Sequence, residues 1–180
     1  MTAHSEETAH TEDFVELAGR FDPPLVIVTT AADGRRAGCV VGFHGQSSID
    51  PAHYAVWISK ANLTYRVALL AGHFAVHRLR STQLELARLF GGNTGDDIDK
   101  FAAVTTHDGP FGVPLLTDCV DRFVLQRVSM WDDGGDHVCF VGTPIAVDLG
   151  PNRSAALRVS DAQDIDAGHD SHETGPPTHA

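Results

Sequence analysis

The sequence predicts a mainly β protein whose strands form a closed or nearly closed antiparallel barrel with short inserted helices. Runs such as 25–30 (LVIVTT) and 54–59 (YAVWIS) are rich in the β-branched and aromatic residues typical of strands. Two tight-turn signals, Asp33-Gly34 and the DDGG run at 132–135, join neighbouring runs as antiparallel hairpins. The last predicted strand is apolar on both faces, so both faces must be covered, and closing the sheet removes exposed edges.

The remaining strands follow from the same composition and turn signals. Gly38, Gly42 and Gly45 are unusual inside a strand region, and they indicate a bulge or a close approach of the backbone to another group. We expect strands at 25–30, 36–44, 54–59, 74–79, 120–130 and 136–147.

Helices are expected where apolar residues recur at helical spacing. Leu63, Val67 and Leu70 lie at positions i, i+4 and i+7, between Asn62 as the N-cap and Gly72 as the C-cap. The other expected helices span 14–20, 83–90 and 96–101.

The two ends of the chain differ in composition from the middle. Residues 1–12 are polar without periodicity, and residues 151–180 contain few large apolar side chains. Such segments bury too little surface to offset chain entropy, so we expect a disordered arm at 1–12 and a disordered tail at 151–180. One folded domain then covers 13–150, which suits a chain of 180 residues.

Charge and cysteine content exclude several classes of protein. A formal net charge of −11 argues against binding to nucleic acid or to an anionic membrane. The N-terminus resembles no secretory signal and no apolar run is long enough to cross a bilayer, so we expect a cytoplasmic location. The three cysteines are expected to be reduced thiols, and no metal site is expected, because no CxxC pair exists and His73 and His77 have no third ligand at an obvious spacing.

The first candidate site is the junction of a strand and a helix, which contains Ser59, Lys60, Asn62 and Thr64. A helix N-terminus with free N–H groups, an ammonium and hydroxyls can hold a phosphate. The alternative from the residues alone is an ordinary capped helix with a solvated lysine nearby.

The second candidate is the segment 39–50 (CVVGFHGQSSID). Repeated glycines followed by Gln46, Ser47 and Ser48 could present backbone groups to a flat ring that forms hydrogen bonds, such as a flavin. A loop with a β-bulge is the alternative.

The third candidate is His137, which follows the predicted hairpin turn at the start of a strand. It could line the mouth of a pocket and contact a nicotinamide or the edge of a flavin, or it could be a histidine on a surface turn. The sequence has no GxSxG, HExxH, P-loop or GxGxxG motif. Any use of NAD(P)H would therefore not involve a Rossmann domain.

These segments together resemble the flavin-reductase-like FMN-binding split-barrel family over about residues 14–148. The order and spacing of S-I-D-P at 48–51, S-K-x-N-x-T at 59–64 and G-D-H at 135–137 carry the resemblance. It implies a split β-barrel with Greek-key connections, working as a homodimer with flavin near the subunit interface. Many members have T-x-S-S-F-x-S-V-S before the D-P, where this chain has Cys, Val and Gly and one extra residue, so it resembles a distinct subgroup.

The resemblance also implies roles for particular residues. The phosphate of FMN (FAD is possible) would be held by Lys60, Asn62 and Thr64 with Ser59 close by, and His137 would lie beside the flavin and the nicotinamide of NADH or NADPH. The residues implied to line the flavin ring are Cys39, Val40, Val41, Gly45, Gln46 and Ser47.

The expected function is hydride transfer from NAD(P)H to flavin, with reduced flavin passing to a partner monooxygenase or another acceptor. The cofactors carry this chemistry, which agrees with the lack of a triad or paired carboxylates in the sequence. Three alternatives stay open. The first is a flavin carrier or sensor without reductase turnover, and the second is a split-barrel enzyme that uses a deazaflavin or acts on a small oxidisable substrate. The third is an acidic barrel that only mediates contacts.

Overall fold

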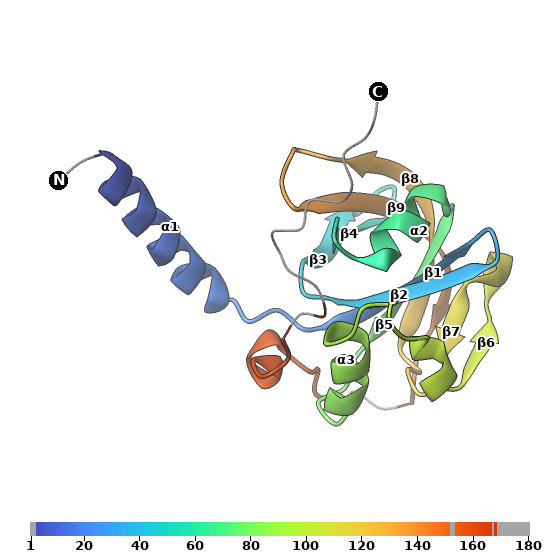
Figure 1. Ribbon diagram of the computed structural model, residues 1–180. Coiled ribbons are helices and arrows are strands. Elements are labelled where there is room, and N and C mark those ends of the chain that lie inside the picture. Colours follow the sequence, from blue (N-terminus) through green and yellow to red (C-terminus); the bar gives the residue numbers. More distant parts are fainter. Residues whose placement is uncertain (1–2, 152–153, 167, 169–180) are drawn as a thin grey trace.

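A computed structural model describes residues 3–151, 154–166 and 168. Within them, seven antiparallel strands form one curled sheet in the order β2-β1-β5-β8-β9-β4-β3 (Figure 1). The expected antiparallel architecture is confirmed. The strands are β1 (Val26–Ala32), β2 (Arg35–Val41), β3 (His44–Ser48), β4 (His53–Ser59), β5 (His73–Arg78), β8 (Arg122–Trp131) and β9 (His137–Asp148).

The β1–β2 hairpin has the tight turn that the sequence predicts. Asp33 and Gly34 both have positive φ, 49° and 74°. Two successive positive φ values are typical of a type I′ turn, whose twist matches that of the flanking strands. The register that follows pairs Val28 with Cys39 and Val26 with Val41, so alternate residues of both strands face the barrel core.

Two sheet edges approach each other where the barrel is split. In this sheet β2 pairs only with β1, and β3 pairs only with β4. The chain passes from β2 to β3 through Gly42 and Phe43, and the backbone N–H of Trp57 in β4 donates to the carbonyl of Phe43 at 2.9 Å. The free edge of β2 therefore lies next to the end of β4.

The described part of the chain also contains three helices and a two-stranded sheet, and two of the helices pack on the barrel. Helix α1 (Ala3–Gly19) projects away from the barrel, α2 (Leu63–Leu70) packs on β1 and β2, and α3 (Leu84–Gly91) packs on β2 (Figure 1). The small sheet pairs β6 (Thr106–Asp108) with β7 (Pro114–Leu116). The 3₁₀ turns are η1 (Lys100–Ala103), η2 (Pro110–Gly112) and η3 (Val159–Ala162).

Several expectations about local structure are corrected. Segment 44–48 is a strand, because it pairs with β4 through a bulge between Gln46 and Ser48. The helix expected at 96–101 is only the 3₁₀ turn η1, with the side chain of Asp99 capping the N–H of Phe101. The arm at 1–12 lies in helix α1 from Ala3 onward, which continues the helix expected at 14–20.

The prediction of a disordered tail from residue 151 is wrong for residues 154–166, which we call the C-terminal strap. Leu157 is fully buried among core side chains that include Leu25 and Leu79. Its carbonyl accepts from the N–H of Leu25 at 2.7 Å, and its N–H donates to the carbonyl of Leu79 at 3.0 Å. A few apolar residues in a polar segment are thus enough to anchor it, because each of them enters an existing core. The expected tail at 169–180 lies outside the described residues.

Candidate functional site

A hollow of about 310 Å³ lies at the split of the barrel, and we call it the central hollow. Its polar lining comes from β4, β9 and the residues before α2. Its apolar lining comes from β2, from Leu25 just before β1, from α3 and from the C-terminal strap. The lining residues are Leu25, Cys39, Val40, Ser59, Asn62, Phe90, Gly91, Asp136, His137, Val159, Ala162 and Ile165.

A smaller side hollow of about 100 Å³ adjoins the central hollow and shares five of its lining residues. It extends along β2 past Val41 and Gly42 to Phe43, and it reaches Trp57 and Ile58 of β4. The two hollows together therefore follow the free edge of β2.

The free edge of β2 supplies backbone hydrogen-bonding groups to both hollows. In an antiparallel pair, every second residue of an edge strand turns its N–H and C=O away from its single partner. Residues 39–41 of β2 line the hollows and pair only with β1 in this sheet. A flat heteroaromatic ring with donors and acceptors on one edge fits such a strand without any particular side chain being required.

Ser59 and Asn62 place polar groups between the end of β4 and the start of α2. Asn62 has extended dihedrals at the N-cap position, and its side chain makes no capping hydrogen bond to the helix. The Ser59 hydroxyl accepts from the N–H of Ala61 at 3.3 Å. The amide of Asn62 is therefore not used by the helix cap, which differs from the cap that the sequence predicts.

His137 lies where the hollows meet. It lines the central hollow, the side hollow and a third hollow on the outer face of the barrel. Its Nδ1 lies 2.8 Å from a carboxylate oxygen of Asp136, and its ring packs edge-on against Phe43 at a centroid distance of 5.3 Å. Hydrogen bonding to Asp136 fixes the ring orientation and leaves Nε2 for another partner.

Lys60 contacts the β8–β9 hairpin. Its Nζ donates to Oδ1 of Asp132 at 2.8 Å, and this contact raises the pKa of Lys60 and lowers that of Asp132. Both side chains are partly exposed, so the pair is screened by solvent. The ammonium lies at the end of β4, one residue after Ser59.

A buried polar group supports β2 from behind. Lys100 is only 4% exposed, and its Nζ donates to the carbonyls of Gly38 at 3.2 Å and Phe90 at 2.9 Å. The Cys39 thiol is buried, and this desolvation raises its pKa to about 11 although the neighbouring Thr64 side chain acts to lower it. Cys39 is therefore a neutral thiol at physiological pH, as expected for a packing residue.

The structure brings together six of the residues that the sequence predicts for the site: Cys39, Val40, Val41, Ser59, Asn62 and His137. Lys60 lies next to this group but is paired with Asp132. Thr64 instead lines a separate cavity of about 370 Å³, which we call the flanking cavity, together with Arg35 and Arg36.

The segment 45–47 departs from the expected ring-lining role. Ser47 lines the outer hollow with His53 and Trp57, on the other side of β4 from the core. Gly45 and Gln46 are not among the residues lining the central or the side hollow, and the Gln46 side chain donates to the carbonyl of Ser48 at 3.2 Å. The physical reason is that β3 pairs with β4 beyond the bend at residues 42–43, which turns this segment away from the split.

Other lining residues were missed from the sequence. Phe90 and Gly91 end α3, and Val159, Ala162 and Ile165 belong to the strap. Phe90 and Gly91 stand at the end of the helix expected at 83–90, where the sequence gives no sign of a site. The apolar residues of the strap are isolated in a polar segment, and no periodicity marked them.

Comparison with known proteins decides the family. Residues 18–163 match the flavin reductase like domain. This chain belongs to the flavin reductase like family. The match covers the barrel and the strap as far as η3, so the resemblance expected from the sequence is confirmed.

Two curated relatives illustrate the similarity. A ferric-chelate reductase (NAD(P)H) of Archaeoglobus fulgidus is 30% identical over 126 residues, which cover 69% of this chain and 75% of that protein. The FMN reductase (NADH) RutF of Methylorubrum extorquens is 32% identical over 125 residues, covering 69% of this chain and 60% of the relative. The chain spans 52%, 37% and 54% of the lengths of three further relatives.

Solved structures show the same fold. An FMN-binding protein from Thermus thermophilus, crystallised with 1-cyclohex-2-enone, superposes with a TM-score of 0.65 at 26% identity over 70% of each chain. Nitrilotriacetate monooxygenase component B from Mycobacterium thermoresistibile gives a TM-score of 0.71 at 23% identity, covering 82% of this chain and 80% of that one. The expected split-barrel fold is confirmed.

The described residues contain neither a helix suited to span a membrane nor a cluster of side chains suited to bind a metal ion. Across residues 3–151, 154–166 and 168, no helix has the length and apolar character needed to cross a bilayer. The same residues contain no group of three or more His, Cys, Asp or Glu side chains arranged to hold a metal ion. The cytoplasmic location stays a prediction.

Proposed function

We propose that this flavin reductase like protein binds FMN in the central and side hollows and transfers hydride to it from NADH or NADPH. The observation that carries the proposal is the convergence of the free β2 edge, Ser59, Asn62 and His137 on one hollow at the split of the barrel. Relatives named as an FMN reductase (NADH) and a ferric-chelate reductase (NAD(P)H) support this donor and this cofactor. FAD is the alternative flavin.

The residues present fit a flavin. An isoalloxazine ring has a pyrimidine edge rich in donors and acceptors and an apolar dimethylbenzene edge. The hollow offers backbone groups of residues 39–41 and the polar side chains of Ser59 and Asn62, and it also has an apolar side formed by Phe90 and the strap. Shape and polarity therefore match a ring with two unlike edges.

Lys60 and Asn62 are the residues we assign to the phosphate, with Ser59 between them and the ring. The backbone N–H groups at the start of α2 point away from the helix and favour an anion. Lys60 must leave or share Asp132 to bind the phosphate, and a partly exposed pair allows this at small cost. Thr64 is not assigned to the phosphate, because it lines the flanking cavity and not the central or the side hollow.

Bound FMN would supply the hydride-accepting chemistry, and the residues around the hollows would position the nicotinamide ring against the flavin. His137 is the side chain we assign to seating the nicotinamide, because it borders all three hollows and is oriented by Asp136. No strong base is needed for hydride transfer, because the cofactors carry this chemistry.

A homodimer is proposed from the outer face of the barrel. The outer hollow has a volume of about 660 Å³ and a largely apolar lining that includes Trp57, Val128, Trp131 and Val141. Trp131 is 70% exposed and Val128 52% exposed, which is unusual for large apolar residues gathered on one face. A second copy of this chain would cover this face and bring its surface close to His137, which also borders the outer hollow.

Delivery of reduced flavin to a monooxygenase is the proposed physiological role. Relatives are named as the reductase subunit of a flavin-dependent monooxygenase in Rhodococcus jostii and the reductase component of a trigonelline monooxygenase in Acinetobacter baylyi.

The identity of the bound chromophore tests the proposal. Heat release from purified protein, followed by chromatography and mass measurement, is expected to yield FMN or FAD. Protein that takes up neither flavin after soaking would contradict the proposal, and a deazaflavin would replace it with the alternative stated above.

A further inference from the structure

The C-terminal strap forms one side of the central hollow. Val159, Ala162 and Ile165 line it beside Phe90 and Gly91. Ile165 lies two residues beyond the segment 18–163 that matches the family.

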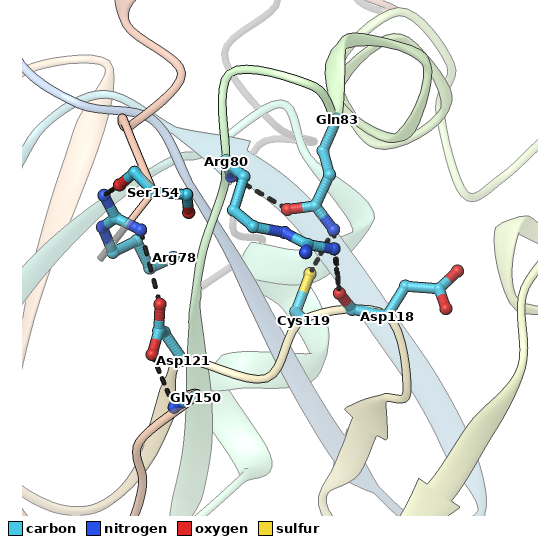
Figure 2. A network of polar contacts seen from close by, with 8 residues as sticks. All are labelled: Arg78, Arg80, Gln83, Asp118, Cys119, Asp121, Gly150 and Ser154. Carbon is cyan, nitrogen blue, oxygen red and sulfur yellow. Dashed lines mark hydrogen bonds and ion pairs between the residues drawn. The ribbon is translucent and has the colours of Figure 1, made fainter. Parts of the chain in front are cut away.

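The strap begins at a polar network that fixes its first residues (Figure 2). Arg78 joins the carbonyl of Ser154 to the carboxylate of Asp121, and Asp121 also accepts from the N–H of Gly150 at 2.7 Å. Arg80 pairs with Ala156 in an isolated β-bridge. The strap therefore enters the site in a fixed direction, just before Leu157 is buried.

Beyond Leu157 the strap is held by contacts at the surface. The carboxylate of Asp22 accepts from both the N–H and the hydroxyl of Ser160 at 2.8 Å. The guanidinium of Arg88, on α3, lies 2.6 Å from a carboxylate oxygen of Asp164. These contacts join the strap on one side to Asp22, three residues after α1, and on the other side to α3. Ala162 lies between the two anchored residues, and Ile165 follows directly after Asp164.

Gly91 lets the strap approach α3 closely. A Cβ added at Gly91 would lie 3.3 Å from Cγ2 of Ile165, closer than an ordinary contact, whereas one added at Gly42 would lie 3.5 Å from Cγ2 of Val159, an ordinary van der Waals distance. Both glycines line the hollows, so the strap side chains rest directly on the walls of the site. Ile165 thereby continues the apolar surface of Phe90 into the hollow.

We propose that the C-terminal strap is a fixed wall of the flavin site and that Ile165 contacts the apolar dimethylbenzene edge of the bound ring. The proposal rests on the proposed flavin function. It assigns the ring's orientation, with the pyrimidine edge toward the free edge of β2 and the dimethylbenzene edge toward the strap. Asp22 and Arg88 are positioning residues that act through the strap.

The first test is FMN binding to the full chain, followed by quenching of flavin fluorescence. Ile165→Ala removes methyl and methylene groups from the wall, and we expect FMN affinity to fall about tenfold. Ile165→Leu keeps the volume and should restore affinity to within about threefold of the unsubstituted chain. Ile98→Ala is the matched control, because Ile98 is a part-exposed isoleucine in the flanking cavity, and its affinity should be unchanged.

The second test needs no substitution. Amide hydrogen exchange of residues 158–166 should slow at least severalfold when FMN is added, because a ligand that contacts the strap stabilises it against local unfolding. Unchanged exchange together with an Ile165→Ala affinity equal to that of Ile98→Ala would overturn the strap proposal while flavin binding stands. Failure of the unsubstituted chain to bind FMN would instead overturn the proposed function.

Discussion

Nζ of Lys60 donates a hydrogen bond to Oδ1 of Asp132 at 2.8 Å, across the gap between the end of β4 and the β8–β9 turn. Asp132 is itself held in the turn, where it accepts from the N–H of Gly134 at 2.9 Å. The cation assigned to the flavin phosphate thus has a carboxylate partner already in place. The Asp132 carboxylate and the flavin phosphate would therefore compete for the ammonium of Lys60. Substitutions of Lys60 and of Asp132 should then change FMN binding in opposite directions.

Lys60→Ala should weaken FMN binding by about tenfold or more, because a charge-assisted hydrogen bond to the phosphate is lost. Binding of riboflavin, which has no phosphate, should change by less than about twofold. Fluorescence titration with both flavins measures the ratio. Equal losses for FMN and riboflavin would show that Lys60 supports the fold and does not bind the phosphate.

Asp132→Asn should strengthen FMN binding, by about twofold to fivefold at low salt, because it removes the competing charge near the phosphate. The gain should shrink as salt is added. Asp118→Asn, at an exposed carboxylate near β7, is the control and should leave affinity unchanged. Weaker FMN binding by Asp132→Asn would mean that Asp132 positions Lys60 and does not compete for it.

Stability should depend on pH through His77. The ring is fully buried, Nδ1 lies 3.2 Å from the carbonyl of Ile27, and Nε2 accepts from the N–H of Leu116 at 3.1 Å. Burial lowers the pKa of His77 to about 4, below its ordinary value of 6.5. At pH values between about 4 and 6.5, the His77 ring is therefore protonated in the unfolded chain but neutral in the folded chain. The free energy of unfolding falls as pH drops through this range, by about 3 kcal/mol in total.

Urea unfolding at several pH values measures this slope. His77→Gln keeps one donor and one acceptor in the side chain but does not titrate, so its stability should be flatter over the same range. It should also be lower than that of the unsubstituted chain at pH 7, by about 1–3 kcal/mol, because the geometry of the two hydrogen bonds is disturbed. An identical slope in both proteins would assign the pH dependence to other groups.

The strands of the barrel could be predicted well because their signals are local. β1, β2, β4, β5, β8 and β9 were placed within a few residues from β-branched runs and turn signals such as Asp33-Gly34. β3 was missed because its sequence, HGQSS, is polar and its strand pairing comes only from β4. The strap was missed because Leu157 is stabilised by a core built from distant residues, which no local pattern reveals.

The site could be predicted only in part for a related reason. Residues that share a short motif, such as Ser59 and Asn62, reach the same hollow because a strand end and a helix start adjoin in sequence. Thr64 belongs to the same motif, yet it lies two residues after Asn62, within α2, and it lines the flanking cavity. Whether Gly45 and Gln46 line the hollows depends on where the chain bends after β2, and the pairing of β3 with β4 sets that bend.

Association through the outer face is expected to depend on Val128. Val128→Glu places a charge in the apolar outer hollow and should convert the proposed dimer to a monomer, because burying an unpaired carboxylate is costly. Leu70→Glu, at an exposed leucine on α2, is the control and should leave the dimer intact. Sedimentation equilibrium measures both masses, and an unsubstituted chain that sediments as a monomer would contradict the proposed interface.

Anaerobic stopped-flow absorbance of the flavin-loaded protein mixed with NADH or NADPH tests the central claim most directly. The account predicts that the absorbance of the bound flavin near 450 nm is lost in a saturable, single-turnover reaction. It also predicts that His137→Ala retains the flavin but needs a higher nicotinamide concentration to reach half of its maximal rate. Bound flavin that stays oxidised with both nicotinamides would contradict hydride transfer at this site and leave a flavin-binding protein without reductase activity.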